Sequence, residues 1–180
     1  MKIIILGNKE HGKDSIAKFI ENAFGLKYAS TSYFALEHFL FDEMIRSGEF
    51  SYNSVEEAYE DRDNYREYLF NAIYKFNTPT PSKLGEKLFS MYPTLCGIRH
   101  KVELEALVVK AEPDLIIWVD ASKRKPLENK KSISVTREQA NAVINNNDSL
   151  MAACREVWDL VIDRLKLSPT NSFKQAYLAV

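Results

Sequence analysis

A glycine-containing segment near the start of the sequence has the spacing of a phosphate-binding loop. Residues 7–15 read Gly-Asn-Lys-Glu-His-Gly-Lys-Asp-Ser, which fits G-x-x-x-x-G-K with aspartate where serine or threonine is usual. Glycine lets the backbone curl so that successive N–H groups point at phosphate oxygens, and the following helix adds its positive dipole. The residues expected to contact a bound nucleotide are Asn8, Lys9, Glu10, His11, Gly12, Lys13, Asp14 and Ser15.

Two side chains of this segment have the clearest chemical roles. Lys13 is expected to reach the β- and γ-phosphates, and the side chain after it normally holds Mg²⁺. A carboxylate is a hard oxygen ligand, so Asp14 either binds Mg²⁺, directly or through water, or caps the helix while the metal is held elsewhere. Ser15 can offer a hydroxyl group to a phosphate, and His11 is expected to act through its backbone rather than its ring.

The elements that must position this loop follow from the apolar pattern. Residues 2–6 and 115–119 have the length and composition of buried parallel strands. Further strands are predicted over 26–29, 94–98 and 142–144, and helices over 14–24, 33–46, 54–76, 82–91, 99–111 and 149–166. This alternation predicts a three-layer α/β/α fold of the P-loop NTPase kind, with a central parallel sheet, in one domain over residues 1–180. Ligands of such sheets bind at the carboxyl ends of the strands, where the polar turns lie.

Composition excludes several classes of protein. The 180 residues are 46% hydrophobic, which is ordinary for a folded chain and too high for a disordered one. A net charge of −1 argues against a bulk electrostatic grip on a nucleic-acid polymer or an anionic membrane. Cys96 and Cys154 lack metal-ligand spacing, so a reduced cytoplasmic protein without a zinc site is expected. The apolar run at residues 3–6 is too short for a signal peptide or a membrane span.

Several segments together resemble a known enzyme family. The strand that leads into Gly-Lys-Asp-Ser resembles the opening of the deoxynucleoside monophosphate kinases of bacteriophages. Segments 61–66, 97–103 and 117–122 agree with that family in order, and the resemblance spans about residues 1–165. Segment 143–150 resembles an ending common among small nucleotide and dephospho-coenzyme A kinases. Two departures from relatives, at Asn141 and Asp148, bear on how the last loop would hold the ATP base.

The resemblance implies a division of the site between ATP with Mg²⁺ and a nucleoside monophosphate. The acceptor would bind in a helical region over about 30–92, with Ser30, Thr31 and Ser32 facing it. A monophosphate dianion needs bidentate donors, which is arginine chemistry, so Arg66 and Arg99 are the candidates for binding it.

Each of these arginines also has an interpretation in which it binds no ligand and only pairs with nearby acidic side chains or faces solvent. Arg99 follows a predicted strand directly, where it either binds phosphate or pairs with Glu103 one turn later. Arg62 and Arg66 are four residues apart and share a face of one predicted helix. Because acidic residues lie close by, that face is either a phosphate site or a solvated charged surface.

Residues 122–139 fit the mobile basic lid of such kinases. Phosphoryl transfer is catalysed chiefly by positioning and by positive charge on the moving group, which a closing lid supplies. Arg124 is the best candidate in the lid, followed by Lys123 and Arg137. Asp120, at the end of a predicted strand, either helps to hold Mg²⁺ from outside its ligand sphere or forms a simple turn. The residues expected to act in catalysis are Lys13, Arg99 and Arg124.

The leading hypothesis is Mg²⁺-dependent transfer of the ATP γ-phosphate to a nucleoside or deoxynucleoside monophosphate. Two alternatives remain: the same chemistry on another small phosphorylated metabolite, such as dephospho-coenzyme A, or ATP binding without catalysis. Tyr33 or Tyr65 is a candidate for stacking on the acceptor base. The expected partner is a small molecule rather than a nucleic-acid polymer or a membrane. The protein is expected to be a monomer or homodimer in the cytoplasm, which is the host's if a phage encodes it.

Overall fold

The computed structural model describes residues 1–177, and at its centre lies a five-stranded sheet. β1 (Ile3–Leu6) lies in the middle, between β3 (Thr94–Cys96) and β4 (Leu115–Asp120). The edge strands are β2 (Tyr28–Ser30), beside β3, and β5 (Ala142–Asn145), beside β4. Every neighbouring pair of strands is parallel, so the predicted α/β class with a central parallel sheet is confirmed.

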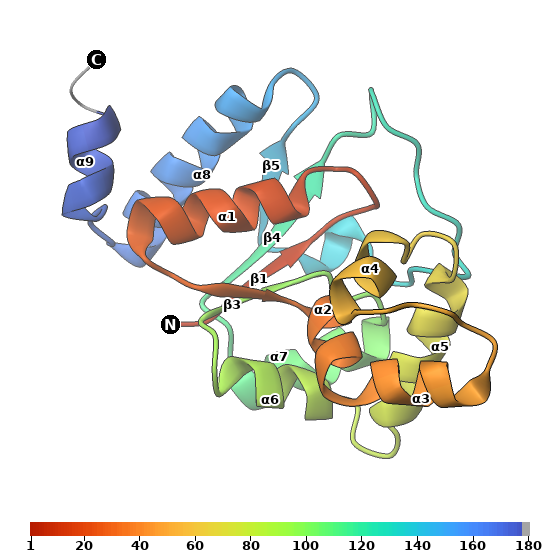
Figure 1. The fold of residues 1–180 in the computed structure, drawn as a ribbon. Coiled ribbons are helices and arrows are strands. Elements are labelled where there is room, and N and C mark those ends of the chain that lie inside the picture. Colours follow the sequence, from red (N-terminus) through yellow and green to blue (C-terminus); the bar gives the residue numbers. More distant parts are fainter. Residues whose placement is uncertain (178–180) are drawn as a thin grey trace.

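Helices cover both faces of this sheet, which gives the three predicted layers (Figure 1). The helices are α1 (Lys13–Phe24), α2 (Thr31–Ala35), the π-helical turn η1 (Leu36–Leu40), α3 (Phe41–Ser47), α4 (Val55–Glu60), α5 (Arg66–Phe76), α6 (Lys83–Phe89), α7 (Lys101–Ala111), the 3-10 turn η2 (Arg137–Gln139), α8 (Leu150–Leu165) and α9 (Asn171–Tyr177). Ile3 and Ile5 of β1 join a core with α1 and α8, whereas Ile4 and Leu6 join the core under α6 and α7. Alternate side chains of a strand point to opposite faces, so one strand anchors both layers.

Helix α1 forms as its sequence predicts, because its ends and its buried face are both encoded locally. Gly12 and Gly25 flank it in the left-handed conformation, with φ of 96° and 72°, a region that glycine enters without steric cost. Ile16 and Ile20 are fully buried against the sheet. The helix therefore starts at the phosphate-binding loop and is fixed to the core along its length.

The helical region between β2 and α6 differs from the prediction at one point. The helix expected over 54–76 is two helices, α4 and α5, separated by a turn at residues 61–65. Asp61 fixes the turn, because its carboxylate accepts hydrogen bonds from the Tyr52 hydroxyl at 2.5 Å and from the Asn64 side chain. Tyr65 adds a hydrogen bond from its hydroxyl to the Ala58 carbonyl. These side-chain bonds, together with the backbone bond from the Asn64 N–H to the Asp61 carbonyl at 2.9 Å, stabilise a turn in place of a continuous helix.

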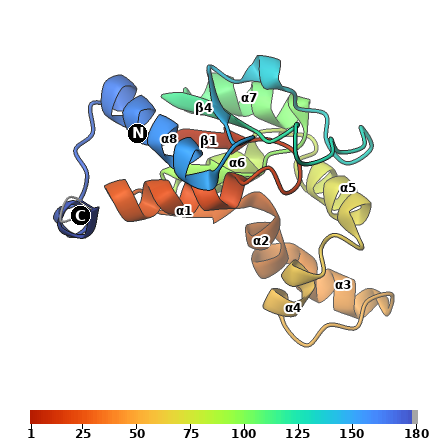
Figure 2. The ribbon, with the colours of Figure 1, turned by 90° about the horizontal axis from the view of Figure 1, so that it is seen from above.

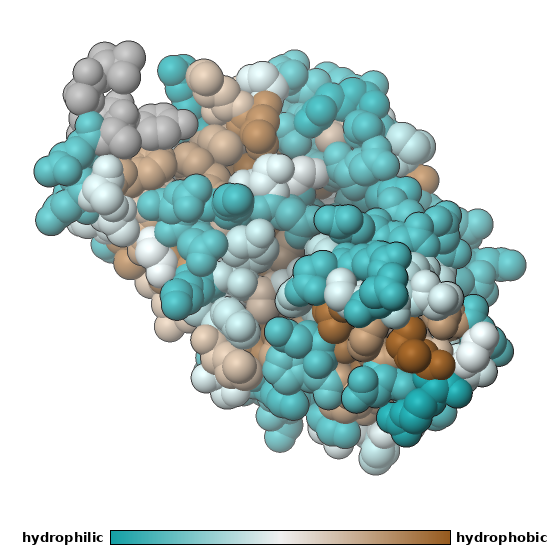
Figure 3. Space-filling model, in the orientation of Figure 1, coloured by the Kyte–Doolittle hydropathy of each residue, from teal (hydrophilic) through white to brown (hydrophobic). Residues whose placement is uncertain are grey.

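This region extends from one end of the sheet, with α3 and α4 farthest from it (Figure 2). The predicted helix over 33–46 is observed as the continuous succession of α2, η1 and α3. Figure 3 shows a surface that is mostly hydrophilic, with small hydrophobic patches over this region. Among residues 1–177, no helix combines the length and apolar character needed to cross a bilayer.

The last third of the chain adds the edge strand and two helices. Ser149 caps α8, accepting a hydrogen bond from the Ala152 N–H at 3.1 Å, as its sequence predicts. The sequence did not predict α9, whose Phe173 packs edge-on against Phe19. Asn141 precedes β5 and accepts a hydrogen bond from the Ile116 N–H at 3.0 Å. Its side chain therefore ties the amino end of β5 to β4, and its expected bearing on the ATP base stays a prediction.

Candidate active site

The phosphate-binding loop crosses the carboxyl edge of the sheet between β1 and α1. Gly7 and Gly12 have φ of 145° and 96°, and both lie where a Cβ atom would collide. A Cβ on Gly7 would be 2.6 Å from the Val119 carbonyl oxygen, and one on Gly12 would be 2.4 Å from Nδ2 of Asn146. Both glycines of the motif are thus required by close packing as well as by conformation.

His11 and Asn146 lock this loop to the neighbouring strands. The Nδ1 atom of His11 accepts a hydrogen bond from the Ala121 N–H at 3.0 Å, and its carbonyl accepts one from Asn146 at 2.9 Å. His11 is fully buried, so its ring as well as its backbone holds the loop in place. The loop between β5 and α8 therefore contacts the phosphate-binding loop through Asn146. The sequence alone did not identify this contact.

A cavity of about 480 Å³ opens beside the loop, bounded by β2, the turn at 61–65, and the start of the segment after β3. Most of the residues predicted to bind nucleotide or acceptor line it. The residues that line it are Lys9, Glu10, Gly12, Lys13, Asp14, Ser15, Ser30, Ser32, Tyr59, Arg62, Asp63, Arg66, Gly97, Arg99 and Lys125. Of the other predicted contacts, Asn8 and His11 are buried residues of the loop that do not line the cavity, and Thr31 donates to the Gly97 carbonyl at 3.0 Å.

Lys13 lies at the floor of this cavity. Its ammonium group donates a hydrogen bond to the Asn8 carbonyl at 2.6 Å, and the residue is 8% exposed. Burial lowers its pKa, as expected for an ammonium group withdrawn from water. The lysine is therefore folded against its own loop, within the cavity where phosphates would enter.

Asp14 is exposed toward the cavity at the start of α1. Its Oδ1 atom accepts a hydrogen bond from the Cys96 thiol at 3.3 Å, and burial keeps the pKa of that thiol well above its usual value. The Ser15 hydroxyl lines the same cavity. A carboxylate and a hydroxyl beside the phosphate loop are a donor set that suits Mg²⁺, which prefers oxygen ligands and retains several waters.

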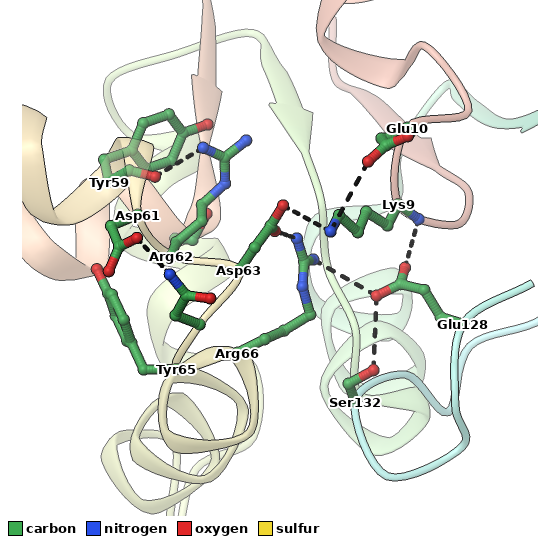
Figure 4. Close-up of polar contacts among 12 residues, drawn as sticks. Lys9, Glu10, Tyr59, Asp61, Arg62, Asp63, Tyr65, Arg66, Glu128 and Ser132 are labelled. Atoms are coloured by element: carbon green, nitrogen blue, oxygen red, sulfur yellow. Dashed lines mark hydrogen bonds and ion pairs between the residues drawn. The ribbon is translucent and has the colours of Figure 1, made fainter. Parts of the chain in front are cut away.

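One residue beside the cavity that the sequence did not single out is Glu128, whose carboxylate contacts Lys9, Arg66 and Ser132 (Figure 4). Its Oε2 atom accepts a hydrogen bond from the Lys9 N–H at 2.5 Å. Its Oε1 atom is 2.7 Å from the Arg99 guanidinium and 3.4 Å from that of Arg66. Arg99 therefore pairs with Glu128 and not with Glu103, which the sequence had offered as its structural partner. In the sequence Glu128 is one of several charged residues in a polar segment, with no distinguishing neighbour.

Four further charged residues that line the cavity form ion pairs across its opening. Asp63 contacts Lys9 at 2.6 Å and also pairs with Arg66, as Figure 4 shows. Lys125 contacts Glu10 at 2.7 Å. Phosphate-loop, helical-region and lid side chains therefore neutralise one another across the opening.

Arg62 takes a different position from the one predicted. It lies in the turn between α4 and α5, so it does not share a helix face with Arg66. Its guanidinium stacks on the Tyr59 ring at 3.9 Å and donates to the Tyr59 carbonyl at 2.7 Å. Both Arg62 and Tyr59 also border an adjoining cavity of about 440 Å³, which Tyr33 lines. Tyr65 is buried, and it is not one of the residues that line these two cavities.

Three lid residues and Asp120 lie outside the cavity in this structure. Arg124 is exposed and donates from Nε to the Asn146 carbonyl at 2.6 Å. Lys123 and Arg137 are also exposed. Asp120 forms the strand-end turn, accepting the Ser122 N–H at 3.0 Å. Among described lid residues it is Lys125 that reaches the cavity, so the catalytic roles of the others remain predictions.

Glu103 is a buried carboxyl group under the site. It is 3% exposed, and its Oε1 atom has no hydrogen-bond partner among residues 1–177. Burial raises its pKa to about 8, although Asn77 acts in the opposite direction. The folded protein therefore keeps a proton on Glu103 at neutral pH, whereas the unfolded chain releases it near the ordinary value of 4.5.

This difference makes the stability depend on pH. Between pH 4.5 and 8 the folded state binds more protons than the unfolded state, so the free energy of unfolding should fall as pH rises, by about 1.4 kcal/mol per unit from this group. Glu103→Gln keeps the shape of the neutral carboxyl group and should flatten that slope. Urea unfolding of both proteins at several pH values measures it. Parallel slopes would show that Glu103 is ionised in the folded protein.

Comparison with known proteins does not identify a function, so any proposal about function rests on the geometry of this cavity. No protein-family model matches the sequence, and no curated protein matches it. Among solved structures, an unliganded sugar kinase from Janibacter sp. HTCC2649 is similar over 93% of this chain and 95% of that one. The sequence identity is 12% and the TM-score is 0.43. A likeness this distant carries no argument about the function of this chain.

Proposed function

We propose that the protein is a Mg²⁺-dependent kinase that transfers the γ-phosphoryl group of ATP to a nucleoside monophosphate or deoxynucleoside monophosphate. The observation that carries this proposal is that the phosphate-binding loop, with Lys13 and Asp14, shares one cavity with Arg66 and Arg99. The first set suits a triphosphate and its metal, and the second suits a monophosphate dianion. A cavity with both sets brings a phosphoryl donor and an acceptor together.

The proposed reaction needs positioning and positive charge more than covalent chemistry. An oxygen of the acceptor phosphate attacks the γ-phosphorus, and the bond from that phosphorus to the β–γ bridging oxygen breaks, giving ADP and the nucleoside diphosphate. Mg²⁺, when bound, neutralises charge on the β- and γ-oxygens. Lys13 would bind the β- and γ-phosphates, and Asp14 and Ser15 would hold the metal from the start of α1. Arg66 and Arg99 would orient the attacking phosphate.

The adjoining cavity gives the acceptor base a place to bind. It shares Asp14, Ser30, Tyr59 and Arg62 with the main cavity. Tyr33 contacts Tyr59 edge-on, with ring centroids 5.2 Å apart. Aromatic side chains that line an open cavity are suited to stacking on a base, so we assign this role to Tyr33 rather than to the buried Tyr65.

The test is ADP production from ATP and Mg²⁺ with each standard ribo- and deoxyribonucleoside monophosphate in turn. We expect rapid turnover with one or a few of them, and only slow ADP formation without an acceptor. ATP binding without stimulation by any of these acceptors would contradict the proposal. Dephospho-coenzyme A in the same assay then separates a kinase for another metabolite from a protein that binds ATP without catalysis.

A further inference from the structure

The Glu128 carboxylate lies in surroundings that a carboxylate of a surface loop rarely has. It comes from the lid (residues 122–139), yet its side chain is 6% exposed. Its two oxygens accept hydrogen bonds from the Lys9 N–H at 2.5 Å and from Arg99 at 2.7 Å, and Arg66 lies at 3.4 Å. The donors come from the phosphate loop, the turn after β3 and the start of α5, so three separate elements converge on one anion.

This donor set fits a phosphate group better than it fits a carboxylate. Backbone N–H groups of a phosphate loop and paired guanidinium groups are the usual ligands of phosphate oxygens. The carboxylate has two oxygens and one negative charge, and its contact with Arg66 is long for a hydrogen bond. A phosphate dianion has three terminal oxygens and about twice the charge, so it can satisfy both arginines and the loop N–H together.

We infer that the Lys9 N–H, Arg66 and Arg99 form a phosphate subsite that Glu128 occupies as a substitute anion, so that ligand phosphate and the lid carboxylate compete for one place. The inference rests on the proposed function, because it concerns a phosphate group of the same reaction. Beyond the proposed function, the inference states that Glu128 of the lid occupies the phosphate subsite until a phosphate group displaces it.

The attachment of the lid agrees with this competition. One end is fixed firmly, since the Ser134 and Val135 N–H groups donate to the Arg99 carbonyl at 2.8 and 3.2 Å. The part that covers the cavity is held by side-chain contacts with the loop. In addition to the carboxylate, the Glu128 N–H donates to Asn8 at 3.1 Å, and Lys125 pairs with Glu10. Loss of these few contacts would free the covering part while the fixed end stays in place.

The test measures binding of inorganic phosphate by calorimetry to the wild-type protein and to Glu128→Gln. The amide keeps the shape of the carboxylate but removes the charge that competes with phosphate. We expect the variant to bind phosphate about tenfold more tightly, because a hydrogen bond to an ionised partner is roughly twice as strong as a neutral one. Glu138→Gln is the matched control, since Glu138 lies on the same lid, is exposed, and bonds to Thr136. It should bind phosphate as the wild type does. Equal affinities in all three proteins would overturn the inference.

Amide hydrogen exchange in the wild-type protein gives a second readout that needs no variant to fold. Saturating phosphate should accelerate exchange at the Glu128 N–H, which loses Asn8, while the Lys9 N–H stays protected by the incoming phosphate. Unchanged exchange at Glu128 with phosphate bound would refute displacement of the lid. Neither readout depends on turnover. If phosphate displaces Glu128 but no acceptor gives ADP, only the kinase proposal is contradicted. If ADP is produced but phosphate does not displace Glu128, only this inference is contradicted.

Discussion

Replacing Lys13 by methionine should lower kcat for ADP production by about 100- to 1000-fold, the loss typical of removing one preorganised charge from a transition state. Lys13 is the cation at the floor of the main cavity, at the base of the phosphate loop. Charge moves toward the β–γ bridging oxygen as the γ-phosphoryl group leaves, and a fixed ammonium group stabilises it. Methionine fills a similar buried volume without the charge, so the loop should keep its shape.

The measurement is steady-state kinetics with ATP and the best acceptor, accompanied by thermal melting. Lys18→Met is the matched control, because Lys18 lies on the same helix and is exposed. The control should retain wild-type kcat. A Lys13 variant that melts like the wild type but turns over normally would remove the loop from the mechanism.

The second large effect is expected at Arg99. Arg99→Lys keeps a positive charge but loses the planar fork that would bind two oxygens of the acceptor phosphate, so kcat/KM for the acceptor should fall about 10- to 100-fold. Its side chain is 18% exposed and lies between the phosphate loop and the lid. Burial lowers its pKa, and a guanidinium group nevertheless stays charged in proteins. The substitution therefore tests geometry at constant charge.

Kinetics with the acceptor varied at saturating ATP measure this effect, and the same assay with ATP varied locates it. Arg155→Lys on the exposed surface of α8 is the control for a change of arginine to lysine as such. We expect the KM for ATP to change little, because in the proposed reaction the loop would hold the triphosphate. A loss confined to the ATP parameters would place Arg99 on the donor rather than on the acceptor.

The sequence alone was sufficient for the parts of the fold that short segments encode. The apolar run of β1, the glycines at 7 and 12, and the lysine between loop and helix are local signals, and the structure places them as predicted. The caps of α1 and α8 and the parallel sheet follow from similar signals. Such features depend on backbone conformation and on periodicity over a few residues, which are the properties that a single sequence shows directly.

Only the tertiary structure determined which side chains meet across the site. Lys9 pairs with Asp63, and Arg99 with Glu128, across separate elements. The interruption of the helix at 61–65 was equally hidden, because it depends on Tyr52 reaching Asp61. The sequence singled out Lys9 and Arg99 as candidate ligands of phosphate, but it gave no sign of their partners Asp63 and Glu128 or of the contact between Tyr52 and Asp61. Their roles arise because the chain path brings opposite charges together at one edge of the sheet, where partial burial makes each pairing energetically significant.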